Sequence, residues 1–199
     1  SHKSSKQTLK ENQYGYMALN SLVNSCILLI EILSLISECQ GDYGLFCSSI
    51  RTWKFSQYFK IIFGEYVSNC LRLVSNFTYV GFAINRLSLI GKEQSKFVTY
   101  VSGLTIGEFM LITILPCLFL PVVKIFRFIP NDIFPEYDYP NPIAFYFDKL
   151  SITLIFVYLS FNILFDLVNY LVFLVLNFIL DVILVIKMKR TIEEKQKNQ

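Results

Sequence analysis

Long apolar segments separated by short polar ones run through the whole chain. The four longest cover residues 17–36, 58–90, 97–123 and 151–186. About 20 consecutive apolar residues are enough to cross the hydrocarbon core of a bilayer, so each segment is long enough. The last segment would need a turn to cross twice, yet neither Gly nor Pro follows Pro142. We therefore expect either one long helix there or an interfacial piece before about Tyr158, in both cases with a crossing over 158–186. The whole pattern predicts an all-α membrane protein with four transmembrane helices in one domain, 1–199.

The segment 58–90 carries polar residues at helical spacing. Steps of three and four residues keep them on one face of an α-helix. Such a face cannot be exposed to lipid, because each unpaired polar group there costs several kcal/mol. It must therefore face other helices or a water-filled cavity. A Glu and an Arg on one intramembrane stripe predict a functional site. This polar stripe consists of Glu65, Asn69, Arg72, Asn76, Tyr79, Ala83 and Arg86.

Composition agrees with a membrane environment and excludes several functions. Hydrophobic residues make up 54% of the chain and charged residues 17%, against about 25% charged residues in a soluble domain; the mean hydropathy is +0.49. The net charge of +3 is too small and too scattered to predict nucleic-acid binding. His2 is the single histidine, and nucleophile-elbow, zincin, phosphate-loop and Cys-x-x-Cys motifs do not occur. We therefore predict that the protein is not an enzyme and holds no metal or cofactor.

Lysine and arginine residues predict the orientation. Basic residues precede the first segment, flank the connection between the second and third, and follow the last. These three regions share one side of the membrane after four crossings. The positive-inside rule makes that side cytoplasmic. Both ends of the chain are therefore expected in the cytoplasm, and membrane lipid is expected around the helices.

Arg72 lies near the middle of its segment, where an unpaired charge would cost about 2.5–3.5 kcal/mol on insertion scales. One interpretation is a ligand pocket in the outer half of the protein, with Glu65, Asn69 and Arg72 as candidates beside Asp166 of the last segment. The other is a structural ion pair that holds helices together. The carboxylates that could pair with Arg72 are Glu65, Glu31, Glu108 and Asp166.

Two further patterns concern packing and covalent links. Gly103-x-x-x-Gly107 predicts a small-residue patch that allows close approach of a neighbouring helix. Cys39 and Cys47 lie in a connection predicted to be extracellular, where oxidation is permitted. A local Cys39–Cys47 disulfide is one interpretation, and two free or otherwise paired thiols are the other.

The end of segment 58–90 resembles a known receptor motif. Asn85-Arg86-Leu87 is similar to the acid-Arg-Tyr motif that ends the third helix of rhodopsin-like G-protein-coupled receptors, with Asn85 in the place of the acid. Residues 53–55, Trp-Lys-Phe, resemble the Trp-x-Phe of the first extracellular loop in that family. Residues 19–25 are similar to the Leu-Asn-Leu-Ala-x-Ala-Asp of the second helix, with a serine in the place of the aspartate.

This resemblance covers almost the whole chain. It implies a fragment of a divergent rhodopsin-like (class A) receptor, containing the second to fifth helices of a seven-helix bundle. It also implies a multi-pass plasma-membrane protein that transduces the signal of an unknown extracellular ligand to a heterotrimeric G protein, which would face Asn85, Arg86 and Leu87. The alternative, suggested by the four segments alone, is a four-helix membrane channel, transporter part or scaffold.

Overall fold

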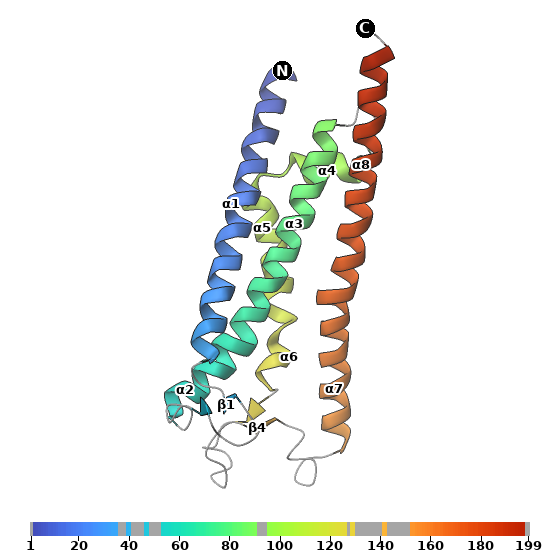
Figure 1. Cartoon of the computed structure of the whole chain (residues 1–199). Helices are drawn as coiled ribbons and strands as arrows, with labels where there is room; N and C mark the ends of the chain where they lie inside the picture. Colours follow the sequence, from blue (N-terminus) through green and yellow to red (C-terminus); the bar gives the residue numbers. More distant parts are fainter. Residues whose placement is uncertain are drawn as a thin grey trace. The chain divides into compact units, whose positions relative to one another are not determined.

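The computed structural model describes residues 2–35, 39–40, 46–47, 53–90, 95–126, 128–129, 141–142 and 152–197. Helices account for nearly all of these residues (Figure 1). The residues group into two compact units: unit 1 contains Ser1–Val23, Val74–Leu115 and Val168–Gln199, and unit 2 contains Asn24–Leu73 and Pro116–Leu167. The predicted all-α class is thus confirmed for the described residues, apart from two pairs of very short strands.

The first helix, α1 (His2–Leu35), begins well before the apolar segment predicted to start at residue 17. The residues ahead of that segment are mainly polar, contain no proline, and include several Lys, Gln and Glu residues that favour helices. The helix therefore continues through a polar stretch. The apolar pattern marks the part that could lie in a membrane, and the helix itself is longer.

The second helical stretch runs without a break through α2 (Lys54–Phe59), η2 (Lys60–Val67) and α3 (Ser68–Ile90). The middle element is a π-helix, in which N–H groups bond carbonyls five residues back; the N–H of Ser68 bonds the carbonyl of Phe63. The prediction of a regular α-helix over 58–90 is therefore wrong in its N-terminal part. The wider π turns change which residues share a face around Glu65.

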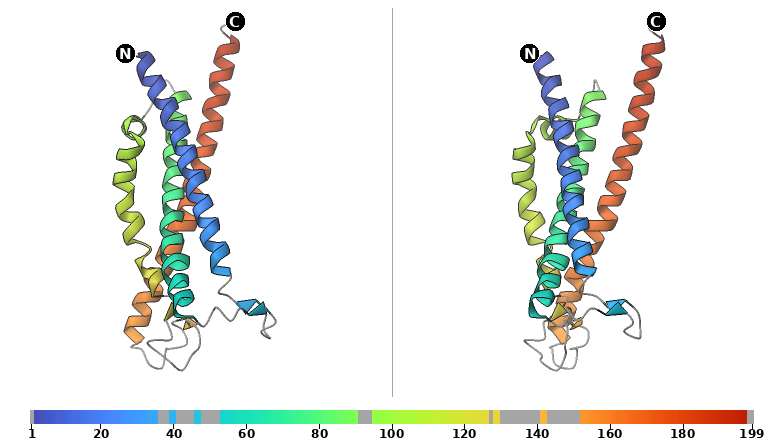
Figure 2. Two further views of the ribbon diagram at one scale, coloured as in Figure 1. Left: turned by 90° about the vertical axis from the view of Figure 1, so that its left-hand side faces the viewer. Right: turned by 60° about the vertical axis from the view of Figure 1, so that its left-hand side comes forward.

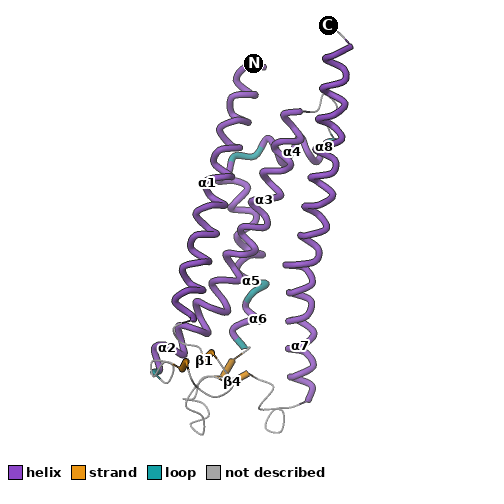
Figure 3. The backbone as a smooth tube through the Cα atoms, in the orientation of Figure 1, coloured by secondary structure: helices purple, strands orange, loops and turns teal. Residues whose placement is uncertain are grey.

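The third predicted span, 97–123, is not one helix. It consists of α4 (Lys96–Gly103), α5 (Ile106–Phe119) and α6 (Val122–Ile125), and the teal turns in Figure 3 separate them. A capping box begins α5. The Glu108 carboxylate accepts hydrogen bonds from the backbone N–H and the hydroxyl of Thr105, at 2.8 and 2.9 Å, and the Glu108 N–H donates to that hydroxyl. Because this Thr-x-x-Glu pattern is visible in the sequence, the break was predictable.

The break also separates the two glycines of the predicted packing patch. Gly103 ends α4 and Gly107 lies in the first turn of α5, so the assumption that they share one helix is wrong. Among the described residues, no atom lies within 4 Å of the position that a Cβ would take on either glycine. The described helices therefore make no close approach at this pair.

The last helical stretch is continuous, as expected from the absence of Gly and Pro. It runs through α7 (Ile152–Asp166), η4 (Leu167–Val172) and α8 (Phe173–Lys197). The single-helix interpretation of this segment is confirmed. The helix extends beyond the predicted crossing of 158–186 at both ends, and its middle element is again a π-helix.

Two pairs of two-residue strands complete the described residues. In unit 2, β1 (Cys39–Gln40) pairs antiparallel with β2 (Phe46–Cys47), and β3 (Phe128–Ile129) pairs antiparallel with β4 (Asn141–Pro142). Each pair joins the two ends of a connection between helices.

Gly81 on α3 is a close-packing glycine in unit 1. A Cβ on this residue would lie 3.0 Å from the ring of Tyr16 on α1 and 3.1 Å from the ring of Phe109 on α5. These two rings meet edge to face, with centroids 5.5 Å apart, an arrangement that aromatic pairs favour. The neighbouring parts of α1, α3 and α5 thus meet at one point (Figure 2).

Replacing Gly81 by valine is expected to destabilise the fold by about 1–3 kcal/mol, because the added methyl groups would overlap two aromatic rings in a packed core. The matched control is Gly107→Val, also a helical glycine, where no described atom stands in the way. Thermal unfolding of both variants in detergent measures the difference. An unfolding temperature for Gly81→Val equal to that of Gly107→Val would contradict this packing.

Three described stretches are long and apolar enough to cross a membrane, by length and composition. They are Glu11–Leu35, Ile106–Ile125 and Ile155–Glu194. The segment 58–90 is not among them, because the Asn, Ser and Arg residues of the polar stripe and its surroundings lower its mean hydropathy.

Candidate functional site

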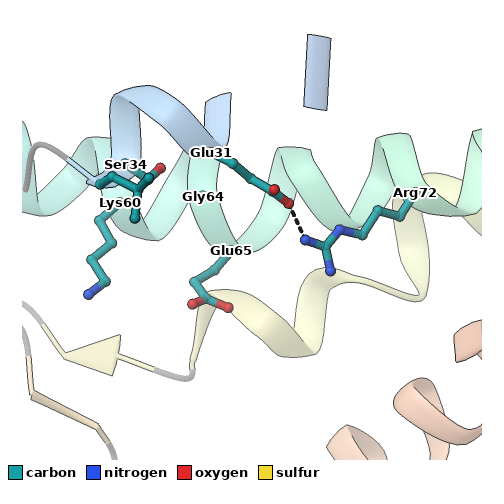
Figure 4. Close-up of a pocket in the computed structure, with 7 residues that line it drawn as sticks. Glu31, Ser34, Lys60, Gly64, Glu65 and Arg72 are labelled. Atoms are coloured by element: carbon teal, nitrogen blue, oxygen red, sulfur yellow. Dashed lines mark hydrogen bonds and ion pairs between the residues drawn. The ribbon is translucent and has the colours of Figure 1, made fainter. Parts of the chain in front are cut away.

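A cavity of about 340 Å³ lies in unit 2, between the C-terminal end of α1 and the η2–α3 helix. Four of its wall residues are charged, and Figure 4 shows how their side chains extend from the two helices. We name this cavity the charged pocket. It is lined by Glu31, Ser34, Leu35, Lys60, Gly64, Glu65 and Arg72.

An ion pair joins the two walls of the charged pocket. Arg72 on α3 donates a hydrogen bond to the carboxylate of Glu31 on α1 (dashed line in Figure 4). The side chains are 37% and 44% exposed, so both remain accessible from the cavity. Of the four carboxylates considered for Arg72, the structure pairs it with Glu31. The two interpretations of Arg72 therefore coincide, because one ion pair both links two helices and lines a pocket.

The four predicted ligand-pocket residues separate into two groups. Glu65 and Arg72 line the charged pocket. Asn69 is buried, and its side-chain amide donates to the backbone carbonyl of Glu65 at 2.6 Å, so it supports the helix behind the pocket. Asp166 is placed elsewhere in unit 2, where it pairs with Lys124. The pocket thus draws on the polar stripe and on α1, and the last segment does not contribute to it.

Four pocket residues were not identified from the sequence, namely Ser34, Leu35, Lys60 and Gly64. Ser34 follows Glu31 at a spacing of three residues on α1, and a stripe analysis of that helix would have found it. Gly64 lies where α1 comes close, because a Cβ there would stand 3.1 Å from the hydroxyl oxygen of Ser34. No local pattern distinguishes Lys60 from the other lysines near helix ends.

A second ion pair in unit 2 buries a lysine. The Lys124 ammonium on α6 lies 2.7 Å from a carboxylate oxygen of Asp166 on α7, and it also lies 5.1 Å from the centroid of the Phe165 ring. The Lys124 side chain is 5% exposed and that of Asp166 is 43% exposed. A buried ammonium requires a compensating charge, which Asp166 supplies. Asp166 is therefore a helix-linking residue in this structure.

In unit 1 the polar stripe is bonded to the last helical stretch. The Asn76 amide donates to both the side-chain oxygen and the backbone carbonyl of Asn169 in η4, at 2.8 and 2.9 Å. The Tyr79 hydroxyl donates to the carboxylate of Asp181 on α8 at 3.0 Å. These bonds show that this part of the stripe faces neighbouring helices, as its spacing predicted.

The motif Asn85-Arg86-Leu87 lies near the C-terminal end of α3, in unit 1. Asn85 and Leu87 are buried at 2% and 3% exposure, whereas Arg86 is intermediate. The guanidinium carbon of Arg86 lies 5.2 Å from the ring centroid of Phe82, one turn earlier on the same helix. This cation–π contact holds the arginine against its own helix. The guanidinium group remains partly accessible.

The strand register of unit 2 bears on the two interpretations of Cys39 and Cys47, a disulfide or two thiols that do not pair with each other. In β1–β2 the backbone of Cys39 stands directly opposite that of Cys47. Directly opposed residues of antiparallel strands have Cα atoms about 4.5–5.5 Å apart, which falls within the range of about 4.4–6.8 Å seen in disulfides.

Peptide mapping without reduction is expected to yield a Cys39–Cys47-linked peptide. Cys26, which is exposed and free, serves as the control for alkylation, and alkylation of all three residues without reduction would contradict the bridge.

Within the described part of the chain, no group of three or more His, Cys, Asp or Glu residues could hold a metal ion. The two carboxylates of the charged pocket stand beside two cations instead, which suits a polar organic ligand better.

Comparison with known proteins finds no relative: no protein-family model matches the chain, and neither a curated protein nor a solved structure matches it. The chemistry of the charged pocket and of the polar stripe is therefore the basis on which a function can be proposed.

Proposed function

We propose that the chain is a fragment of a divergent rhodopsin-like G-protein-coupled receptor of the plasma membrane, with four transmembrane helices and both ends in the cytoplasm. The observation that carries the proposal is the charged pocket. It opens on the polar stripe of the helix that also presents Arg86. A receptor needs a ligand site and a cytoplasmic coupling surface, and α3 carries residues of both.

Exposed apolar side chains support the membrane part of the proposal. On α8, Leu174, Phe178 and Val185 are 66%, 68% and 64% exposed. Continuous apolar surface of this kind is rare on water-soluble proteins and is stable when lipid covers it. The second stretch tolerates its polar residues because they bond to other helices, as Arg72 does to Glu31 and Asn76 does to Asn169. A fourth crossing there is consistent with the rule that intramembrane polar groups face the interior.

In the proposed mechanism a ligand in the charged pocket competes for the partners of the Glu31–Arg72 pair. Such a ligand binds with different affinity to the state in which this ion pair is formed and to the state in which it is broken. This difference in affinity shifts the equilibrium between the two states. A rotation or a shift of α3 would then reposition Arg86 at the cytoplasmic surface, where a heterotrimeric G protein binds.

The test uses the full-length protein in lipid nanodiscs with purified heterotrimeric G proteins of each major class. We expect it to accelerate nucleotide exchange on at least one class, in the basal state or with added ligand. A protein that accelerates exchange on none of them, and conducts ions in a planar bilayer, would instead be a channel.

A further inference from the structure

The charged pocket has balanced charge. Its ionisable lining residues are two carboxylates, Glu31 and Glu65, and two cations, Lys60 and Arg72. A simple anion would approach both carboxylates, and a simple cation would approach both basic groups. Each would lose through repulsion much of what it gains through attraction. A ligand that carries one charge of each sign avoids this repulsion.

The π-helical geometry of η2 places an acid and a base of the pocket together. Lys60 and Glu65 are five residues apart, which is the hydrogen-bond spacing of a π-helix. In an α-helix, residues five apart do not share a face, since neighbours there are three or four apart. Figure 4 shows that both side chains extend to the same side of the helix. The π-helical turns of η2 therefore place an ammonium and a carboxylate on the same side of the helix, where both line the pocket.

The opposite part of the pocket is the Glu31–Arg72 ion pair, which repeats the same combination of charges. Gly64 lies between Lys60 and Glu65 in sequence, and its missing side chain leaves space, since a Cβ would stand 3.1 Å from the hydroxyl oxygen of Ser34. The volume of about 340 Å³ is near the lower end of the range for ligand pockets, about 300–1,000 Å³. The occupant is therefore small.

We propose that the charged pocket binds a small zwitterion of the amino-acid class, with its carboxylate toward Lys60 and its ammonium toward Glu65. This inference rests on the proposed receptor function and names the chemical class of its ligand. The Arg72–Glu31 pair offers the same two charges to the polar groups of the ligand's side chain. Backbone-like amines and carboxylates are recognised through charge-assisted hydrogen bonds, which are the stronger kind.

The test measures binding to the full-length protein in nanodiscs by isothermal titration calorimetry, without G protein. The probes are the twenty common amino acids, followed by the N-acetyl and C-terminal amide derivatives of the one that binds most tightly. Each derivative removes one charge, and we expect each to bind at least about tenfold more weakly, which corresponds to about 1.4 kcal/mol.

Two charge-neutralising variants assign the ends of the ligand. Lys60→Gln is expected to weaken binding of the amino acid at least about tenfold, and to leave its C-terminal amide, which has no carboxylate, binding as it does to the unaltered protein. Glu65→Gln is expected to do the same with the N-acetyl derivative in the place of the amide. Glu108→Gln is the matched control, because this carboxylate caps α5 in unit 1 and should leave binding unchanged.

Unaltered affinity of the singly charged derivatives would overturn the inference, as would a failure of all twenty amino acids to bind. Thermal unfolding without ligand establishes that each variant is folded. Should Lys60→Gln not fold, Lys60→Arg retains the charge and should retain binding, while Gly64→Val fills the cavity and should abolish it. G-protein exchange without amino-acid binding would refute this ligand class alone, whereas amino-acid binding without exchange on any G protein would refute the receptor function.

Discussion

Replacing Arg86 by alanine in the full-length protein is expected to lower G-protein activation at least about tenfold, a coupling loss of about 1.4 kcal/mol or more. Arg86 is the charged residue of the Asn85-Arg86-Leu87 motif, and its guanidinium group stays partly accessible while it stacks on Phe82. Alanine removes five hydrogen-bond donors at the proposed coupling surface. Ligand affinity in the charged pocket should stay unchanged in the absence of G protein, because Arg86 is not among the lining residues.

Nucleotide exchange in nanodiscs, measured beside ligand binding on the same preparation, separates the two effects. Arg190→Ala is the control, since it removes the same charge from an exposed position on α8. Arg86→Lys keeps the charge and loses the planar fork of donors, so it should restore activity only in part. Full exchange activity in Arg86→Ala, at normal expression, would remove Arg86 from the coupling surface and with it the main support for the motif.

Replacing Asp166 by leucine is expected to destabilise the protein by about 3–5 kcal/mol. The change leaves the Lys124 ammonium, which is 5% exposed, without its carboxylate, and the contact with the Phe165 ring is too weak to compensate. The double variant Lys124→Met/Asp166→Leu should recover most of the loss, because removing both charges also removes the need to bury one.

Unfolding in detergent with increasing denaturant gives the free energies for this double-mutant cycle. Asp181→Asn is the control: that carboxylate is exposed and accepts one hydrogen bond, from Tyr79, so its loss should cost no more than about 1 kcal/mol. If the double variant were no more stable than Asp166→Leu, the Lys124–Asp166 pair would not be the source of the stability.

The sequence predicted the polar stripe well, because helical spacing is a local property that does not depend on partners. The residues to which the members of the stripe bond were not predictable. Arg72 had four carboxylates within reach by sequence, and the packing of α1 against α3 selects Glu31. Lys124 shows the same limitation, since α6 packs against η2 and α7, which are both distant from it in sequence.

The helix irregularities divide into one that could have been predicted and others that could not. The start of α5 carries a Thr-x-x-Glu capping box at Thr105–Glu108, a pattern that sequence inspection can find. The π-helical segment Lys60–Val67 has no comparable sequence pattern, because its hydrogen-bond shift follows from packing. Without that shift, Lys60 and Glu65 would not lie on the same side of the helix, so regular helical spacing does not place Lys60 at the pocket.

The Glu31–Arg72 pair has a consequence for the biogenesis of a membrane protein. The two residues are 41 positions apart, and translation at about 5–20 residues per second separates their emergence from the ribosome by about 2–8 s. During that interval α1 has already been synthesised, and Glu31 lacks the Arg72 guanidinium that it pairs with in the folded structure. In the proposed membrane topology, Glu31 therefore has to stay at an aqueous surface or in the insertion machinery until Arg72 has been synthesised. Because the pair forms only after Arg72 has been synthesised, we expect the first two helical stretches of the proposed receptor to insert together, as a hairpin.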